Sequence, residues 1–83
     1  MRAKIYSKND CGWCVRAKEL LQKHNVEVVE YNVEWKPEWK QMLKEDCEKL
    51  GFVPKTVPQI WIEKLYIGGY EELTEFIYPD TKS

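Results

Sequence analysis

The sequence predicts an α/β fold, with a mixed four-stranded sheet that carries helices on both faces in the order β-α-β-α-β-β-α. Segments in which apolar and polar residues alternate are interspersed with segments whose apolar residues recur every three or four positions, as in strands and helices. The first two strand-like segments are joined through a helix, which indicates parallel pairing and a right-handed crossover. The last two are separated only by Glu63 and Lys64, which indicates a tight turn and makes the sheet mixed.

Three elements account for the first 33 residues. Residues 2–7 alternate polar and apolar side chains and predict a strand that ends in a polar loop. Residues 12–24 contain no proline and repeat apolar side chains at helical spacing, so they predict a helix that stops near Asn25. Residues 26–33 alternate again and are rich in valine, which favours a second strand.

The second half contains the remaining helices and strands. Pro37 suits the first turn of a helix, and Gly51 suits its end as a left-handed cap. Its apolar face is expected at positions 39, 42, 43, 47 and 50. The elements expected after it are strands at 59–62 and 65–67, a helix at 70–78 and a polar tail at 79–83. We expect a single domain over residues 1–83.

Composition limits the classes of function. Basic and acidic residues number 13 and 14, for a net charge of −1, and no basic run of the kind that binds nucleic acid is present. No apolar stretch approaches the ~18–20 residues of a membrane span, and no signal peptide is visible at the N-terminus. Three cysteines are an odd number and few for a secreted disulfide scaffold. We therefore expect a cytoplasmic monomer without nucleic-acid or membrane partners.

The segment Cys11-Gly12-Trp13-Cys14 opens the first predicted helix. Cysteines three residues apart on a helical turn lie on one face. Their expected Cα separation of roughly 5–5.5 Å allows an unstrained disulfide. The first sulfur also lies where the unpaired N–H groups of a helix N-terminus point. This arrangement indicates a reactive, reversible dithiol, and hence redox exchange.

Together with three other segments in the same order, this dithiol resembles the glutaredoxin family of thioredoxin-fold oxidoreductases over about residues 2–78. The other segments are Tyr6-Ser7-Lys8, Thr56-Val57-Pro58-Gln59 and Gly68-Gly69. The resemblance implies a thioredoxin-like fold. It also implies a glutathione-dependent oxidoreductase that reduces protein disulfides, glutathione mixed disulfides or both. The family's usual dithiol is Cys-Pro-Tyr-Cys, so glycine and tryptophan in the middle are a departure.

The two cysteines are expected to have different roles. A free cysteine with a pKa of ~8.5 is only a few per cent ionised near neutrality, and the thiolate is the attacking species. A helix dipole contributes at most ~2 kcal/mol, less than the ~2.7 kcal/mol that a two-unit shift requires. We therefore expect N–H groups of Trp13 and Cys14 to donate to Cys11, with the Lys8 cation nearby. Cys11 is expected to be the exposed nucleophile and Cys14 the shielded thiol that resolves the mixed disulfide.

By resemblance, glutathione binds around this dithiol. A cis Pro58 would turn the backbone of Val57 toward glutathione; from the residues alone, the start of a strand is the favoured interpretation of Pro58. N–H groups near Tyr70 and Glu71, after the two glycines, would hold the γ-glutamyl carboxylate; a plain turn is the alternative. Lysines would pair with the glycine-end carboxylate, unless they are simply solvated. The implied glutathione-binding residues are Lys8, Trp13, Lys55, Thr56, Val57, Pro58, Gly68, Gly69, Tyr70 and Glu71.

Other interpretations remain open at this point. Zinc needs four ligands, usually two spaced pairs, and one C-x-x-C supplies too few, so no metal is expected. Some glutaredoxins with a small residue in place of the proline hold a [2Fe–2S] cluster between two chains with glutathione, so the resemblance leaves this role open for a chain with Gly12. A thioredoxin-like protein recharged by thioredoxin reductase is the third alternative. Clients would be disulfide-containing or glutathionylated proteins, with ribonucleotide reductase as one by family analogy.

Four further residues receive no catalytic role. Cys47 lies on the apolar stripe of a helix, where a buried cysteine behaves as a small hydrophobe. His24 is expected at the surface near a helix end. The sequence does not decide whether Trp35 and Trp39 belong to the core or to a partner surface.

Overall fold

The computed structural model of the chain describes residues 1–79, so positions 80–83 of the expected polar tail lie outside the described residues. The predicted order of elements is confirmed. The elements are β1 (Arg2–Ser7), α1 (Gly12–Lys23), β2 (Glu27–Asn32), α2 (Pro37–Lys49), β3 (Gln59–Ile62), β4 (Leu65–Gly68) and α3 (Tyr70–Ile77). The described helices lack the length and apolar character that a membrane crossing needs.

The sheet is mixed, with the strand order β2-β1-β3-β4. β1 pairs parallel with β2 and antiparallel with β3, and β4 pairs antiparallel with β3. The central position of β1 is shown by Tyr6, which lies opposite Tyr31 on one side and Gln59 on the other. The loop that follows β1 therefore leaves from the middle of the sheet, and this loop leads into the two cysteines.

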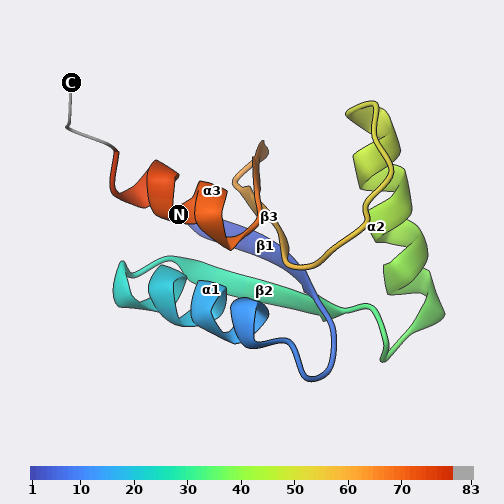
Figure 1. Ribbon diagram of the computed structural model, residues 1–83, viewed down its shortest axis with the longest axis horizontal. Coiled ribbons are helices and arrows are strands. Elements are labelled where there is room, and N and C mark those ends of the chain that lie inside the picture. The colour runs from blue at the N-terminus through green and yellow to red at the C-terminus, as the bar shows by residue number, and fades with distance from the viewer. Residues whose placement is uncertain (80–83) are drawn as a thin grey trace.

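The sheet has a separate core on each face, because successive side chains of a strand point to opposite faces. Ala3 and Ile5 of β1 pack with Ile60 of β3 against α1 and α3, represented by Leu21 and Leu73. On the other face, the alternate strand residues Tyr6 and Trp61 pack against Leu43 and Cys47 of α2. Figure 1 accordingly shows α1 and α3 together and α2 apart from both. Helices on both faces are thus confirmed.

The helices α1 and α2 both end at a residue with a positive φ. After α1, Asn25 takes a positive φ of 61°, and the N–H of Val26 returns to the carbonyl of Leu21. After α2, Gly51 has a φ of +89°, and the N–H of Phe52 returns to Cys47. Both are Schellman ends, so the two stop signals in the sequence are confirmed.

One residue of the expected apolar face of α2 is not part of it. Leu50 is the C-cap of α2 and is 50% exposed, because the chain leaves the helical path there. At the other end of the helix, Trp39 is part of the apolar face, as expected, and packs edge-to-face on Tyr31 with ring centroids 5.3 Å apart. The apolar contact of α2 with the sheet therefore runs from Trp39 to Cys47.

A polar cluster also attaches α2 to the sheet. Asp46 of α2 accepts hydrogen bonds from the Lys4 ammonium at 2.6 Å and from the Tyr6 hydroxyl at 2.5 Å. Burial would raise the pKa of Asp46, but the hydrogen bonds from Lys4 and Tyr6 outweigh it and the pKa is lowered. Burial and the neighbouring Asp46 raise the pKa of Tyr6. These contacts hold α2 against the sheet. α2 in turn supplies Leu43 to the wall of a groove that runs along Val57.

Candidate active site

Cys11 and Cys14 form a disulfide across the first turn of α1, with their Cα atoms 5.3 Å apart. Cys11 is the N-cap of the helix, in an extended backbone conformation. The N–H of Cys14 donates to Cys11 Sγ at 3.1 Å. An N-cap side chain reaches the N–H of the second or third helical residue, and here it reaches the third. The expected second bond, from Trp13 N–H, is not formed among the described residues.

The two sulfurs differ in access to solvent. Cys14 is only 2% exposed, whereas Cys11 is partly exposed. The Cys11 Sγ also lies 3.9 Å from the carbonyl oxygen of Val57. Because a disulfide sulfur carries no proton, this is a contact in the oxidised form and becomes available to a thiol donor on reduction. This asymmetry suits an attacking thiol at position 11 and a resolving thiol at position 14.

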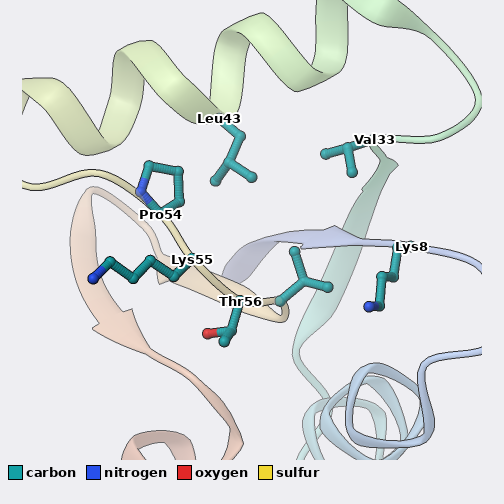
Figure 2. Close-up of a pocket in the computed structure, with 7 residues that line it drawn as sticks. Lys8, Val33, Leu43, Pro54, Lys55 and Thr56 are labelled. Carbon is teal, nitrogen blue, oxygen red and sulfur yellow. The ribbon is translucent and has the colours of Figure 1, made fainter.

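A groove of about 180 Å³ runs along the segment that carries Val57. We call it the Val57 groove. Its lining includes Lys8, Lys55 and Thr56, with Leu43 of α2 on the far wall. Figure 2 shows Lys8 and Lys55 at opposite ends of the groove, with Thr56 between them. The structure thus brings these implied glutathione-binding residues to one groove, and the Val57–Pro58 peptide bond is cis.

The start of α3 lies next to this groove. A side chain at Gly69, the N-cap of α3, would place its Cβ 3.6 Å from the carbonyl oxygen of Pro58. Gly68 has a φ of +120°, a conformation that glycine adopts without strain. The ring of Tyr70 packs against the ring of Trp13 at a tilt of 38°, with centroids 5.4 Å apart, and Trp13 is 56% exposed. The expected carboxylate-binding N-terminus is therefore placed beside the dithiol.

Sequence reasoning missed Glu72. Its carboxylate accepts the N–H of Gly69 at 2.8 Å and caps α3. Together with Glu71, it puts two acidic side chains on the first turn. The signal was present in the sequence, because an acidic residue three positions after an N-cap is one half of a capping box. Glu72 places a fixed negative charge beside the N–H groups expected to hold a carboxylate.

A second groove, of about 490 Å³, borders the dithiol on its other side. We call it the Trp35 groove. Cys11 and Cys14 both line it, together with Trp35 from the segment after β2. Of the implied glutathione-binding residues, only Lys8 lines both grooves. No local pattern in the sequence indicated this groove, since it forms where the loop after β1 and the start of α1 pack beside the end of β2 and Trp35.

A partly buried ion pair lies in the wall of the Trp35 groove. The Lys18 ammonium contacts the Glu30 carboxylate at 2.9 Å, and the Ser7 hydroxyl donates to the same carboxylate. Burial would raise the pKa of Glu30, but the hydrogen bonds from Ser7 and Lys18 outweigh it and the pKa is lowered. Glu30 is therefore ionised at neutral pH, and the Lys18 ammonium offsets its negative charge.

Two of the four residues that received no catalytic role, Cys47 and His24, lie away from the dithiol. Cys47 is fully buried in the core under α2, and burial together with Asp46 raises the pKa of its thiol. His24 is exposed at the end of α1, with Nε2 2.8 Å from the hydroxyl of Tyr78. Both predictions are confirmed. Within residues 1–79, no group of three or more His, Cys, Asp or Glu side chains is arranged to hold a metal ion.

Comparisons with known proteins agree with this site. The glutaredoxin family model matches residues 3–67. A glutaredoxin of Pseudomonas aeruginosa is 41% identical over 69 residues, covering 83% of this chain and 76% of its own. Glutaredoxin 1 of Escherichia coli is 32% identical over 79 residues, covering 93% of each chain.

Solved glutaredoxin structures share the fold. Glutaredoxin 1 of Francisella tularensis, in complex with cacodylate, is 28% identical with a TM-score of 0.67 and covers 92% of this chain and 91% of its own. A dithiolic glutaredoxin of Trypanosoma brucei brucei is also 28% identical, with a TM-score of 0.75 and coverage of 90% and 75%. These matches do not favour the iron–sulfur or the thioredoxin-reductase alternative. The chain belongs to the glutaredoxin family and is a glutathione-dependent thiol–disulfide oxidoreductase with a Cys11–Cys14 dithiol.

Proposed function

We propose that Cys11 is the nucleophile and Cys14 the resolving thiol of this reaction. The Cys11 thiolate attacks one sulfur of a client disulfide, forms a mixed disulfide and releases the other client sulfur as a thiolate, which takes up a proton. Cys14 then loses its proton and attacks the Cys11 sulfur. This step expels the reduced client and re-forms the Cys11–Cys14 bridge.

Two molecules of glutathione complete the cycle. The first attacks the Cys11 sulfur of the bridge and releases the Cys14 thiolate. The second attacks the glutathione sulfur of the mixed disulfide, which releases the Cys11 thiolate and glutathione disulfide. A glutathionylated client follows the shorter route, in which Cys11 takes the glutathionyl group directly and Cys14 is not needed.

One observation carries the assignment of roles. The N–H of Cys14 points at Cys11 Sγ, and Cys11 is partly exposed to solvent while Cys14 is buried. A helix N-terminus favours an anion by at most ~2 kcal/mol, and a hydrogen bond to a charged group contributes roughly 1.5–3 kcal/mol. Together they reach the ~2.7 kcal/mol needed for a two-unit fall in pKa.

We further propose that glutathione lies along the Val57 groove and ends at α3. An extended tripeptide spans about 10 Å, and its cysteine must reach Cys11. Its backbone pairs with Val57 as an added strand, and its γ-glutamyl carboxylate lies at the N–H groups of Tyr70 and Glu71. Lys8 and Lys55 face the other carboxylate. The contacts that join Cys11 to Val57 and Trp13 to Tyr70 support this path.

The clients in this proposal are protein disulfides and glutathionylated proteins, with ribonucleotide reductase as a candidate by family analogy. The assignment of clients rests on the chemistry of the dithiol, which acts on any accessible disulfide. A cytoplasmic location remains part of the proposal because three cysteines suit a reducing compartment, and a monomer is proposed with it.

Paired serine variants test the roles. Turnover of hydroxyethyl disulfide with glutathione, coupled to NADPH and glutathione reductase, should vanish in Cys11→Ser and persist in Cys14→Ser. Reduction of insulin disulfides should be lost in both. Cys47→Ala is the matched control and should keep both activities. Retention of hydroxyethyl disulfide turnover by Cys11→Ser, with its loss in Cys14→Ser, would reverse the roles. Faster turnover with thioredoxin reductase than with glutathione would overturn the choice of reductant.

A further inference from the structure

Trp35 combines high exposure with a fixed position. Its side chain is among the most exposed large apolar groups of the chain, at 64%, yet its indole N–H donates to Asn9 Oδ1 at 3.1 Å. The Asn32 amide donates to the same oxygen, and the N–H of Asn9 donates to Glu34 at 2.7 Å. Asn9 stands two residues before Cys11. The loop that carries the nucleophile therefore also holds the tryptophan ring in place.

The ring lines the groove that glutathione does not use. Trp35 shares the Trp35 groove with both cysteines. The proposed glutathione path leaves Cys11 in another direction, along the Val57 groove to α3, and a tripeptide of about 10 Å is too short to occupy both. An exposed aromatic surface beside the dithiol thus has no role in binding the reductant.

We propose that Trp35 is the docking contact for the polypeptide client while Cys11 attacks the client's disulfide. This inference rests on the proposed function, because the client's disulfide must reach Cys11. Transient redox encounters bury less than ~1,200 Å² in total, or about 600 Å² on each partner, equal to a disc of roughly 14 Å radius. Since Trp35 lines the same cavity as Cys11, a disc centred on Cys11 includes it. A protein client therefore covers Trp35, whereas a small disulfide does not.

Three features make Trp35 a contact that contributes to binding. Tryptophan is enriched among the residues that dominate interface energies. The hydrogen bond to Asn9 orders the ring in advance, which lowers the entropy cost of binding. The charges of the groove are balanced, since Lys18 and Glu30 pair with each other and the lining also contains one further residue of each sign, Lys8 and Asp10. The Trp35 contact should therefore be apolar and insensitive to salt.

Two substrates that share one reaction test the proposal. Glutathionylated serum albumin and the mixed disulfide of glutathione with mercaptoethanol both give up their glutathionyl group to Cys11 and differ only in the size of the leaving thiol. In Trp35→Ala, kcat/KM for the albumin substrate should fall about five- to tenfold, equally at low and high salt. The value for the small substrate should stay within about twofold of wild type. Trp35→Phe, which keeps an aromatic surface, should retain most of the albumin activity.

Leu65→Ala is the matched control. Leu65 is 56% exposed, but it lies in the hairpin that pairs with the start of β1, about 20 Å from the dithiol end of that strand. It should leave both rates unchanged. The proposal is overturned if Trp35→Ala reduces both substrates equally, if it reduces neither, or if Leu65→Ala matches its effect. Absence of small-substrate turnover in the wild type would instead refute the proposed function, and this inference with it.

Discussion

Replacing Asp46 by asparagine should destabilise the fold by removing the charge that attaches α2 to the sheet. Asp46 accepts from the Lys4 ammonium at 2.6 Å and from the Tyr6 hydroxyl at 2.5 Å. The Lys4 and Asp46 side chains are only 32% and 22% exposed, so solvent screens the pair incompletely. Because α2 carries Leu43, a wall of the Val57 groove, the same change should also weaken glutathione binding.

The magnitude follows from these contacts. A hydrogen bond to a charged group contributes roughly 1.5–3 kcal/mol, and a neutral one about half as much. Asparagine keeps an acceptor but removes the charge, so two such bonds lose about 2 kcal/mol in total. For a chain of this length, that lowers Tm by about 8–16 °C.

Urea unfolding at a series of pH values measures the effect. Because the pKa of Asp46 is lowered in the folded state, its contribution is present at neutral pH and is lost as pH falls below about 4. The gap between wild type and Asp46→Asn should close over that range. Arg2→Gln, which breaks an exposed 3.5 Å pair with Glu27, is the control and should cost less than about 0.5 kcal/mol. A gap that persists undiminished at low pH, or an effect no larger than the control's, would refute this reasoning.

Three other changes should have distinct readouts. Glu72→Gln keeps the helix-capping acceptor but removes a charge beside the proposed carboxylate site, so the apparent KM for glutathione should fall about two- to fivefold; a rise would contradict this. Trp13→Ala removes the 5.4 Å ring contact with Tyr70 and should raise the same KM about two- to tenfold, whereas Trp35→Ala should leave it unchanged; a loss confined to kcat would count against this role. Burial raises the pKa of Cys47, so the unfolded state loses this proton first and stability should fall as pH rises past about 8.5. Cys47→Ala should flatten that decline in urea unfolding curves, and an unchanged slope would exclude the thiol as its source.

Features that depend on neighbouring residues could be predicted from the sequence. Asn25 and Gly51 end helices because they tolerate a positive φ, and the dithiol spacing gave the Cα separation to within a few tenths of an ångström. The start of β2 shifted by one residue because a local helix-capping bond competes with strand pairing there. Val26, expected in a strand, instead donates its N–H to Leu21 at the end of α1.

Features that join distant segments could not be predicted in this way. The hydrogen bond from Trp35 to Asn9 spans 26 residues and the pair of Lys4 with Asp46 spans 42, and no local pattern encodes either. Glu72 is different, because its position three residues after the N-cap was readable. The candidate site was therefore predicted where a backbone motif forms it, and missed where packing between β2 and the loop after β1 creates the Trp35 groove.

The most direct test is the rate at which Cys11 reacts with iodoacetamide as a function of pH, measured by mass spectrometry in Cys14→Ser. The serine keeps the backbone N–H at position 14 that donates to Cys11 Sγ, and the buried Cys47 serves as an unreactive internal reference. If main-chain donors stabilise the anion, Cys11 should react at full rate well below the pKa of ~8.5 of a free cysteine. A midpoint at that ordinary value would contradict the account.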